Sequence, residues 1–201
     1  MKLYTYIPLF FLFIFHINQI KAEIYKIGFG SCIDQDFPQS IWLPIEKEKL
    51  NSFIFLGDNV YGDDDSGNLN KLKGAYIKQK KLLPEWLNKT NVYSIWDDHD
   101  FGVNDGGSSF KLKDESKKLY LDFWNIPIED ERHNRKGIYF NKIIEIQNYK
   151  IHLIGLDTRY FRSDLSGTKL FYKQDNSVTS TILGDDQWKW LENTIKKDAD
   201  L

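Results

Sequence analysis

Four short apolar runs, each closed by a polar cluster, constrain what this chain can fold into. Each run has the length of a β-strand and is rich in β-branched or aromatic residues. The runs lack strict alternation of apolar and polar residues, which is typical of strands covered on both faces. They are Ile24–Phe29, Ser52–Leu56, Val92–Trp96 and Ile151–Leu156. The pattern predicts an α/β fold with its functional groups beyond the strand ends.

Amphipathic stretches between these runs predict helices. Pro84 is expected to break the second helix, because proline cannot continue a helical hydrogen-bond ladder. Gly137–Gln147 and Ile151–Asp157 predict a hairpin that turns at residues 148–150. The predicted helices are Ser40–Leu50, Leu69–Asn88, Asp114–Phe123 and Asp185–Lys196.

The first 22 residues are typical of a secretory signal peptide. Met1–Lys2 gives a positive start, Ile7–Ile17 is almost wholly apolar, and Ala22 is a small residue at the predicted cleavage point. The apolar run is shorter than the roughly 20 residues of a membrane span, although an uncleaved anchor is the alternative. We therefore expect a protein that is secreted or held in the lumen of the secretory pathway, without stable membrane insertion after cleavage.

The remaining residues, 23–201, are expected to form one domain. Their length is close to the roughly 150 residues of a typical domain. The net charge of −2 gives no indication of a nucleic-acid partner.

The clusters after the first two runs contain groups that bind metals. Asp58 follows a strand and a glycine, and Tyr61 lies three residues further on. Cys32 has no cysteine partner in the chain. A carboxylate, a phenolate and a thiolate together suit a highly charged cation such as ferric iron. The alternative is a turn aspartate that caps backbone amides, with Tyr61 packed beside it.

The clusters after the third and fourth runs add acid–base and anion-binding groups. Asp97, Asp98 and Asp100 surround His99, and three such carboxylates repel one another unless a cation offsets them. His99 is suited to donating a proton near neutral pH. Arg159 could clamp phosphate oxygens, or could instead form a structural pair with Asp157.

Five motifs in this order resemble the PhoD-like family of alkaline phosphatases, a branch of the metallophosphatases. The resemblance implies a sandwich of two β-sheets flanked by helices, with metals at the strand ends. It also implies hydrolysis of small phosphate esters by a metal-activated water, with Fe³⁺ and Ca²⁺ as cofactors. The expected substrates are phosphomonoesters, with phosphodiesters as the alternative. The motifs are Phe29–Cys32, Leu56–Asp63, Trp96–Asp105, Leu156–Arg162 and Leu183–Trp188.

Carried over by position, the resemblance assigns roles to individual residues. Asp58 would bridge two metals, and His99 would lie next to the leaving group of the ester. Independently of the resemblance, the position of Arg159 after the fourth run predicts that it would offset charge on the phosphoryl oxygens. The metal ligands implied by the resemblance are Cys32, Asp58, Tyr61, Asp98 and Asn104.

One family element is missing from the printed sequence. The family pattern continues with a Gly-Asp-x-His element after the helix that contains Trp188, whereas the sequence ends at Leu201. We therefore expect a metallophosphatase domain that is incomplete at its C-terminus. The alternative function is a non-catalytic secreted metal-binding module, or an inactive fragment that lacks the C-terminal metal ligands.

Overall fold

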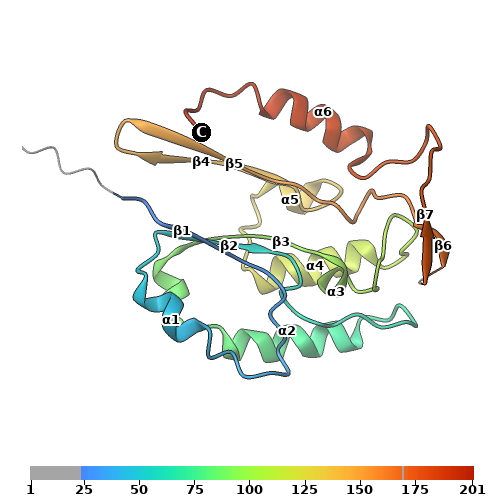
Figure 1. Ribbon diagram of the computed structural model, residues 1–201, viewed down its shortest axis with the longest axis horizontal. Helices are drawn as coiled ribbons and strands as arrows, with labels where there is room; N and C mark the ends of the chain where they lie inside the picture. The colour runs from blue at the N-terminus through green and yellow to red at the C-terminus, as the bar shows by residue number, and fades with distance from the viewer. Residues whose placement is uncertain (1–23, 169) are drawn as a thin grey trace, which may run out of the picture.

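The computed structural model describes residues 24–168 and 170–201, which form a mixed α/β fold (Figure 1). The predicted signal peptide at residues 1–22 lies outside the described residues. The strands are β1 Ile27–Gly30, β2 Ser52–Leu56, β3 Asn91–Ile95, β4 Phe140–Ile146, β5 Tyr149–Gly155, β6 Ser166–Thr168 and β7 Phe171–Lys173. The helices are α1 Trp42–Lys47, α2 Asn70–Leu82, the 3₁₀ helix η1 Glu85–Lys89, α3 Asp98–Phe101, α4 Lys113–Phe123, α5 Glu131–Asn134 and α6 Gly184–Thr194.

Three of the predicted strands form a parallel sheet in the order β1-β2-β3. The central strand β2 has the predicted bounds and is the most buried of the three. Phe53 and Phe55 of β2 pack against Trp42 of α1, with ring centroids 5.6 and 5.9 Å apart. This aromatic cluster fixes α1 against one face of the sheet.

The fourth predicted strand lies in a separate sheet, paired with β4 as an antiparallel hairpin. The predicted turn at residues 148–150 was wrong, because Ile146 already pairs with Tyr149 and the turn consists of Gln147 and Asn148. Gln147 adopts a φ of 52°, which lets a two-residue turn close the hairpin. A further short hairpin joins β6 to β7.

The two larger sheets lie in adjacent layers (Figure 1). In this view α6 lies on the outer side of the β4–β5 hairpin, and α1 and α2 lie on the far side of the parallel sheet. The rings of Tyr93 in β3 and Phe140 in β4 stack with centroids 6.3 Å apart. The carboxylate of Asp157, just after β5, accepts a hydrogen bond of 2.9 Å from the indole of Trp96, just after β3. The polar ends of both sheets are therefore linked.

The predicted helices are present: α1 and α2 are shorter than predicted, whereas α4 and α6 each begin one residue earlier. Helix α2 stops at Leu82, and Leu83 is extended before Pro84, as the restriction on residues before proline requires. The helices α3 and α5 were not predicted, because four residues are too few to show a helical period.

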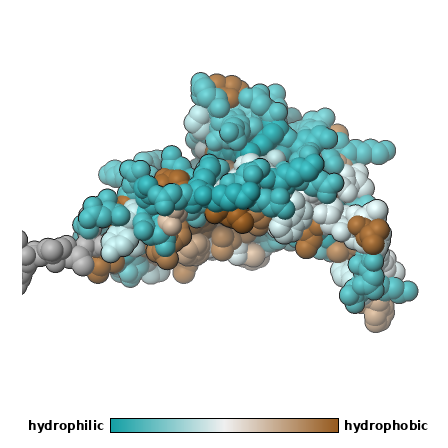
Figure 2. All heavy atoms as spheres, turned by 90° about the horizontal axis from the view of Figure 1, so that it is seen from above, coloured by the Kyte–Doolittle hydropathy of each residue, from teal (hydrophilic) through white to brown (hydrophobic). Residues whose placement is uncertain are grey.

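Coverage of the parallel sheet is uneven. Phe29 of β1 is 62% exposed and Leu56 at the end of β2 is 44% exposed, so the prediction that the strands are covered on both faces was wrong at these two positions. Figure 2 shows that the surface seen from above is largely hydrophilic, with apolar patches along one side. No helix among the described residues is long and apolar enough to span a membrane.

Candidate metal centre

The loops that follow β1 and β2 meet at the carboxyl end of the parallel sheet. The amide of Cys32 donates to the carbonyl of Gly57 over 3.2 Å, and the amide of Ile33 donates to the carbonyl of Asp58 over 2.9 Å. Gly57, Asp58 and Cys32 all have positive φ, at 104°, 50° and 58°. Non-glycine residues adopt this conformation at a cost and concentrate at functional sites. The turn therefore fixes where the Cys32 and Asp58 side chains lie.

Asp58 is a buried carboxylate with an unpaired oxygen. Its side chain is among the buried polar groups, and its Oδ2 accepts a bond of 3.5 Å from the thiol of Cys32. Its Oδ1 is buried without a hydrogen-bond partner among the described residues. Burial raises the pKa of Asp58, and the charge of Asp97 raises it further. The alternative of a turn aspartate that caps backbone amides was wrong, because the Asp58 side chain bonds no amide of the described chain.

Tyr61 lies beside the same carboxylate. Gln35 fixes its backbone, accepting from the Tyr61 amide over 2.8 Å and donating to its carbonyl over 3.3 Å. The ring packs against His99 with centroids 4.4 Å apart. Burial raises the pKa of the Tyr61 phenol, and its contact with Cys32 and the charge of Asp58 raise it further. Without a cation nearby, this phenol stays protonated.

Asp98 and Asp100, two of the three carboxylates after Trp96, have different roles. Asp100 is fully buried and accepts from the amides of Asp97 and Asn59 over 2.6 and 3.2 Å, so it stabilises the loop. Asp98 is 8% exposed, and its Oδ2 accepts from the amide of Asp105 over 2.8 Å. A carboxylate oxygen of Asp98 also lies within 4.8 Å of ligand atoms of Asp58 and His99, so Asp98 belongs to the site.

His99 is held by an acidic residue from the neighbouring loop. Its Nδ1 lies 2.7 Å from Oδ1 of Asp63, and both side chains are largely shielded from solvent. A carboxylate on one ring nitrogen fixes the ring orientation and leaves the other nitrogen for chemistry. The loop of Asp63 is attached to α3, which contains His99, by a bond of 3.2 Å from the Gly62 amide to the His99 carbonyl.

Arg159 lies against Asp97 and Asp98, two of the acidic residues that follow Trp96. Its Nε donates to Asp97 over 2.5 Å and its Nη2 donates to Asp98 over 3.3 Å. Burial works against its charge, but the hydrogen bond and charge of Asp97 outweigh that effect and its pKa is raised. The alternative side-chain pair with Asp157 was wrong, because the Asp157 carboxylate accepts from the backbone amide of Arg159 and not from its guanidinium.

The structure brings most of the predicted residues to one place. Metal-ligating atoms of Asp58, Asp98 and His99 all lie within 4.8 Å of one another. Asn104 stands at the border of this group: its side chain donates to Asp105 over 3.1 Å, and it lines an adjoining cavity of about 640 Å³.

Some neighbours of the site could not be found from sequence. Gln35 belongs to none of the motifs, and its hydrogen bonds to the Tyr61 backbone depend on how two loops pack. Asp63 closes the Leu56–Asp63 motif, but nothing in the sequence indicates which side chain it meets. Its contact with His99 depends on the tertiary fold.

Comparisons with known proteins gave no match. A scan against models of protein families matched none of them. Searches of curated proteins and of solved structures likewise found no similar protein.

Proposed function

We propose that this protein is a metal-dependent phosphoric ester hydrolase of the PhoD-like alkaline phosphatase type, secreted or held in the lumen of the secretory pathway. In this proposal the two sheets correspond to the metallophosphatase sandwich. The observation that supports it best is the unpaired, buried Oδ1 of Asp58 beside Asp98 and His99. Buried polar atoms are almost always satisfied, so an orphaned carboxylate oxygen among other acids points to a cation.

The donor set fits a metal centre. Cys32, Asp58, Tyr61 and Asp98 would hold the cations, with Fe³⁺ and Ca²⁺ as the proposed pair and Asn104 as an outer ligand. Thiolate, phenolate and carboxylate donors suit a ferric ion, and carboxylate and amide oxygens suit calcium. Bound cations supply Lewis acidity and lower the pKa of a coordinated water. The negative charges of Asp58 and Asp98 give the site the sign that such cations require.

The chain's own residues would orient the ester and move a proton. The two hydrogen bonds from the Arg159 side chain use Nε and Nη2, so its Nη1 hydrogens remain for a phosphoryl oxygen. His99, with Nδ1 engaged by Asp63, would present Nε2 to the leaving oxygen and give it a proton. The cavity beside Asn104 leaves room for the alcohol part of the substrate.

The experiment is turnover of p-nitrophenyl phosphate at alkaline pH with calcium and iron. Asp58→Asn should lower turnover by at least about a hundredfold, since even residues behind metal ligands cost 10–100-fold. The matched control is Asp64→Asn, whose carboxylate in the adjacent loop bonds Ser66 and Asn68 of the same loop. Wild-type turnover in Asp58→Asn would remove the role given to Asp58. Bound metal without turnover in the unmodified chain would favour the non-catalytic metal-binding module.

A further inference from the structure

A second cavity, distinct from the candidate metal centre, lies at the amino end of β3. It has a volume of about 430 Å³, within the usual range for small-molecule sites. It extends from η1 and β3 to the segment after α4 and to Phe140 of β4. None of the proposed metal ligands, nor His99 or Arg159, lines it. The cavity is therefore a separate feature between the two sheets.

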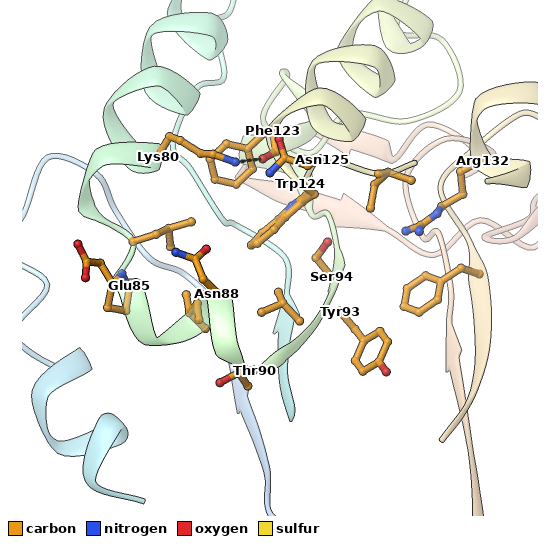
Figure 3. Close-up of a pocket in the computed structure, with 16 residues that line it drawn as sticks. Lys80, Glu85, Asn88, Thr90, Tyr93, Ser94, Phe123, Trp124, Asn125 and Arg132 are labelled. Atoms are coloured by element: carbon orange, nitrogen blue, oxygen red, sulfur yellow. Dashed lines mark hydrogen bonds between the residues drawn. The ribbon is translucent and has the colours of Figure 1, made fainter. Parts of the chain in front are cut away.

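Aromatic side chains form much of its wall. Tyr93, Phe123, Trp124 and Phe140 contribute rings from β3, from the end of α4 and from β4 (Figure 3). Flat aromatic surfaces favour an aromatic guest, since ring pairs gain energy beyond the burial of their area. These rings favour a planar aromatic guest along this wall, and polar side chains such as Asn88, Ser94 and Asn125 line the rest of the cavity.

The charged groups at the cavity are mainly cationic. Figure 3 shows Lys80 and Arg132 on opposite sides of it, with Trp124 between them. Lys80 donates to the carbonyl of Phe123 over 2.7 Å, and no carboxylate of the described residues pairs with it. The Lys80 residue as a whole is exposed, and partial burial lowers the pKa of its ammonium. Such a charge gains from an anion placed beside it.

Arg132 is the other cation, and Glu85 is the one acidic residue among the described residues that line the cavity. Arg132 is buried, donates through Nε and Nη2 to Asp130, and lies over the ring of Phe140 at 4.9 Å. The Glu85 carboxylate points away from the aromatic wall (Figure 3). The charge that faces the cavity is therefore positive, with Lys80 the cation that has no carboxylate partner.

We propose that this cavity binds a small aromatic compound that carries one oxyanion, with its ring against Tyr93, Trp124 and Phe140 and its anionic group on Lys80. This ligand would bind away from the metal centre, where the proposed ester substrate binds, and its binding would need no metal. The proposal does not rest on the hydrolase function.

Isothermal titration of the metal-free protein with 1-naphthaleneacetate tests this proposal, with 2-(1-naphthyl)ethanol as the neutral probe of the same shape. We expect one site for the anion and weaker binding of the alcohol. Lys80→Gln keeps a donor for the Phe123 carbonyl but removes the charge, and should weaken binding of the anion about tenfold while leaving the alcohol unchanged. Lys81→Gln, on the same helix but outside the cavity, is the matched control.

Three results would overturn the proposal. The first is equal binding of anion and alcohol, and the second is an equal effect of Lys80→Gln and Lys81→Gln. The third is loss of binding in Asp58→Asn, which would place the anion in the metal centre instead. Circular dichroism melts of each variant beside the wild type separate a loss of binding from a loss of folding.

Discussion

At the scale of single residues, the turn at Gly57 decides whether the donor groups meet. Its φ of 104° is accessible to glycine and rare for other residues. A Cβ at this position would lie 2.6 Å from the Cβ of Asp97 and 2.8 Å from its amide nitrogen. The close approach of these two loops is what brings Asp58 beside the acidic run after β3.

Gly57→Ala should therefore destabilise the protein. We expect a loss of about 1–3 kcal/mol in the free energy of unfolding, from backbone strain and the clash with Asp97. Gly74 is the matched control, because it lies inside α2 and a Cβ there meets nothing within 4 Å. Gly74→Ala should stabilise by about 0.5–1 kcal/mol. Urea denaturation measures both, and equal effects would contradict this account.

Asp63 is a positioning residue in the proposed hydrolase, acting through His99. Asp63→Asn removes the charge that holds Nδ1 and should lower kcat by about 10–100-fold with little change in KM. The metal content should stay at the wild-type level, since Asp63 is not among the proposed ligands. A pH profile of kcat distinguishes this role from a structural one: it should shift for Asp63→Asn and stay in place for Asp64→Asn.

At the scale of elements, the short helix α5 is stabilised by its N-cap residue Asp130. The carboxylate of Asp130 accepts from the amide of Arg132 over 2.9 Å and pairs with its guanidinium over 2.8 Å. The hydrogen bond from the Arg132 side chain is the main cause that lowers the pKa of Asp130. A carboxyl whose pKa is lowered in the folded state stabilises that state at neutral pH and loses this effect on acidification.

Asp130→Ala should cost about 1 kcal/mol at pH 7, the usual value of a helix cap. The difference from wild type should persist down to pH ~4, the ordinary value for aspartate, and vanish as the pH falls through the lowered pKa. Asp198→Ala is the control, because its side chain is 93% exposed and exposed ion pairs contribute little. A pH-independent loss in Asp130→Ala would contradict the assignment.

The longer strands and helices followed from local sequence, whereas their connections and the short strands β6 and β7 did not. The run at Ser52–Leu56 and the break before Pro84 are set by neighbouring residues, so both could be predicted. The predicted position of the β4–β5 turn was wrong, because Gln147 and Asn148 contain no glycine to mark a two-residue turn. The exposure of Phe29 depends on what packs against the sheet, which local sequence does not specify.

At the scale of the whole molecule, Asp157 connects the two larger sheets and α6. Its carboxylate accepts from Trp96 and from the amides of Ile138, Arg159 and Tyr160. Its backbone exchanges two hydrogen bonds of 2.8 Å with the side chain of Gln187 in α6. This network orients the segment from which Arg159 reaches the acidic run.

The candidate site was predictable in part, because some of its residues follow directly from the order of the strands. Cys32, Asp58 and Asp98 could be found because parallel strands end at one edge of a sheet. The partners that orient the site, such as Asp63 and Gln35, belong to contacts between loops that no periodic pattern encodes. The different roles of the three carboxylates after Trp96 could not be predicted either, since three aspartates in one short segment look alike in sequence and only the fold separates them.

The most direct test of this account is the metal content of the purified chain, measured by mass spectrometry after incubation with iron and calcium and removal of unbound ions. We predict bound metal in stoichiometric amounts in the wild type and in Asp64→Asn, and its loss in Asp58→Asn and Asp98→Asn. A wild-type chain that is folded by circular dichroism and binds no metal, or equal binding in all four proteins, would contradict the central claim.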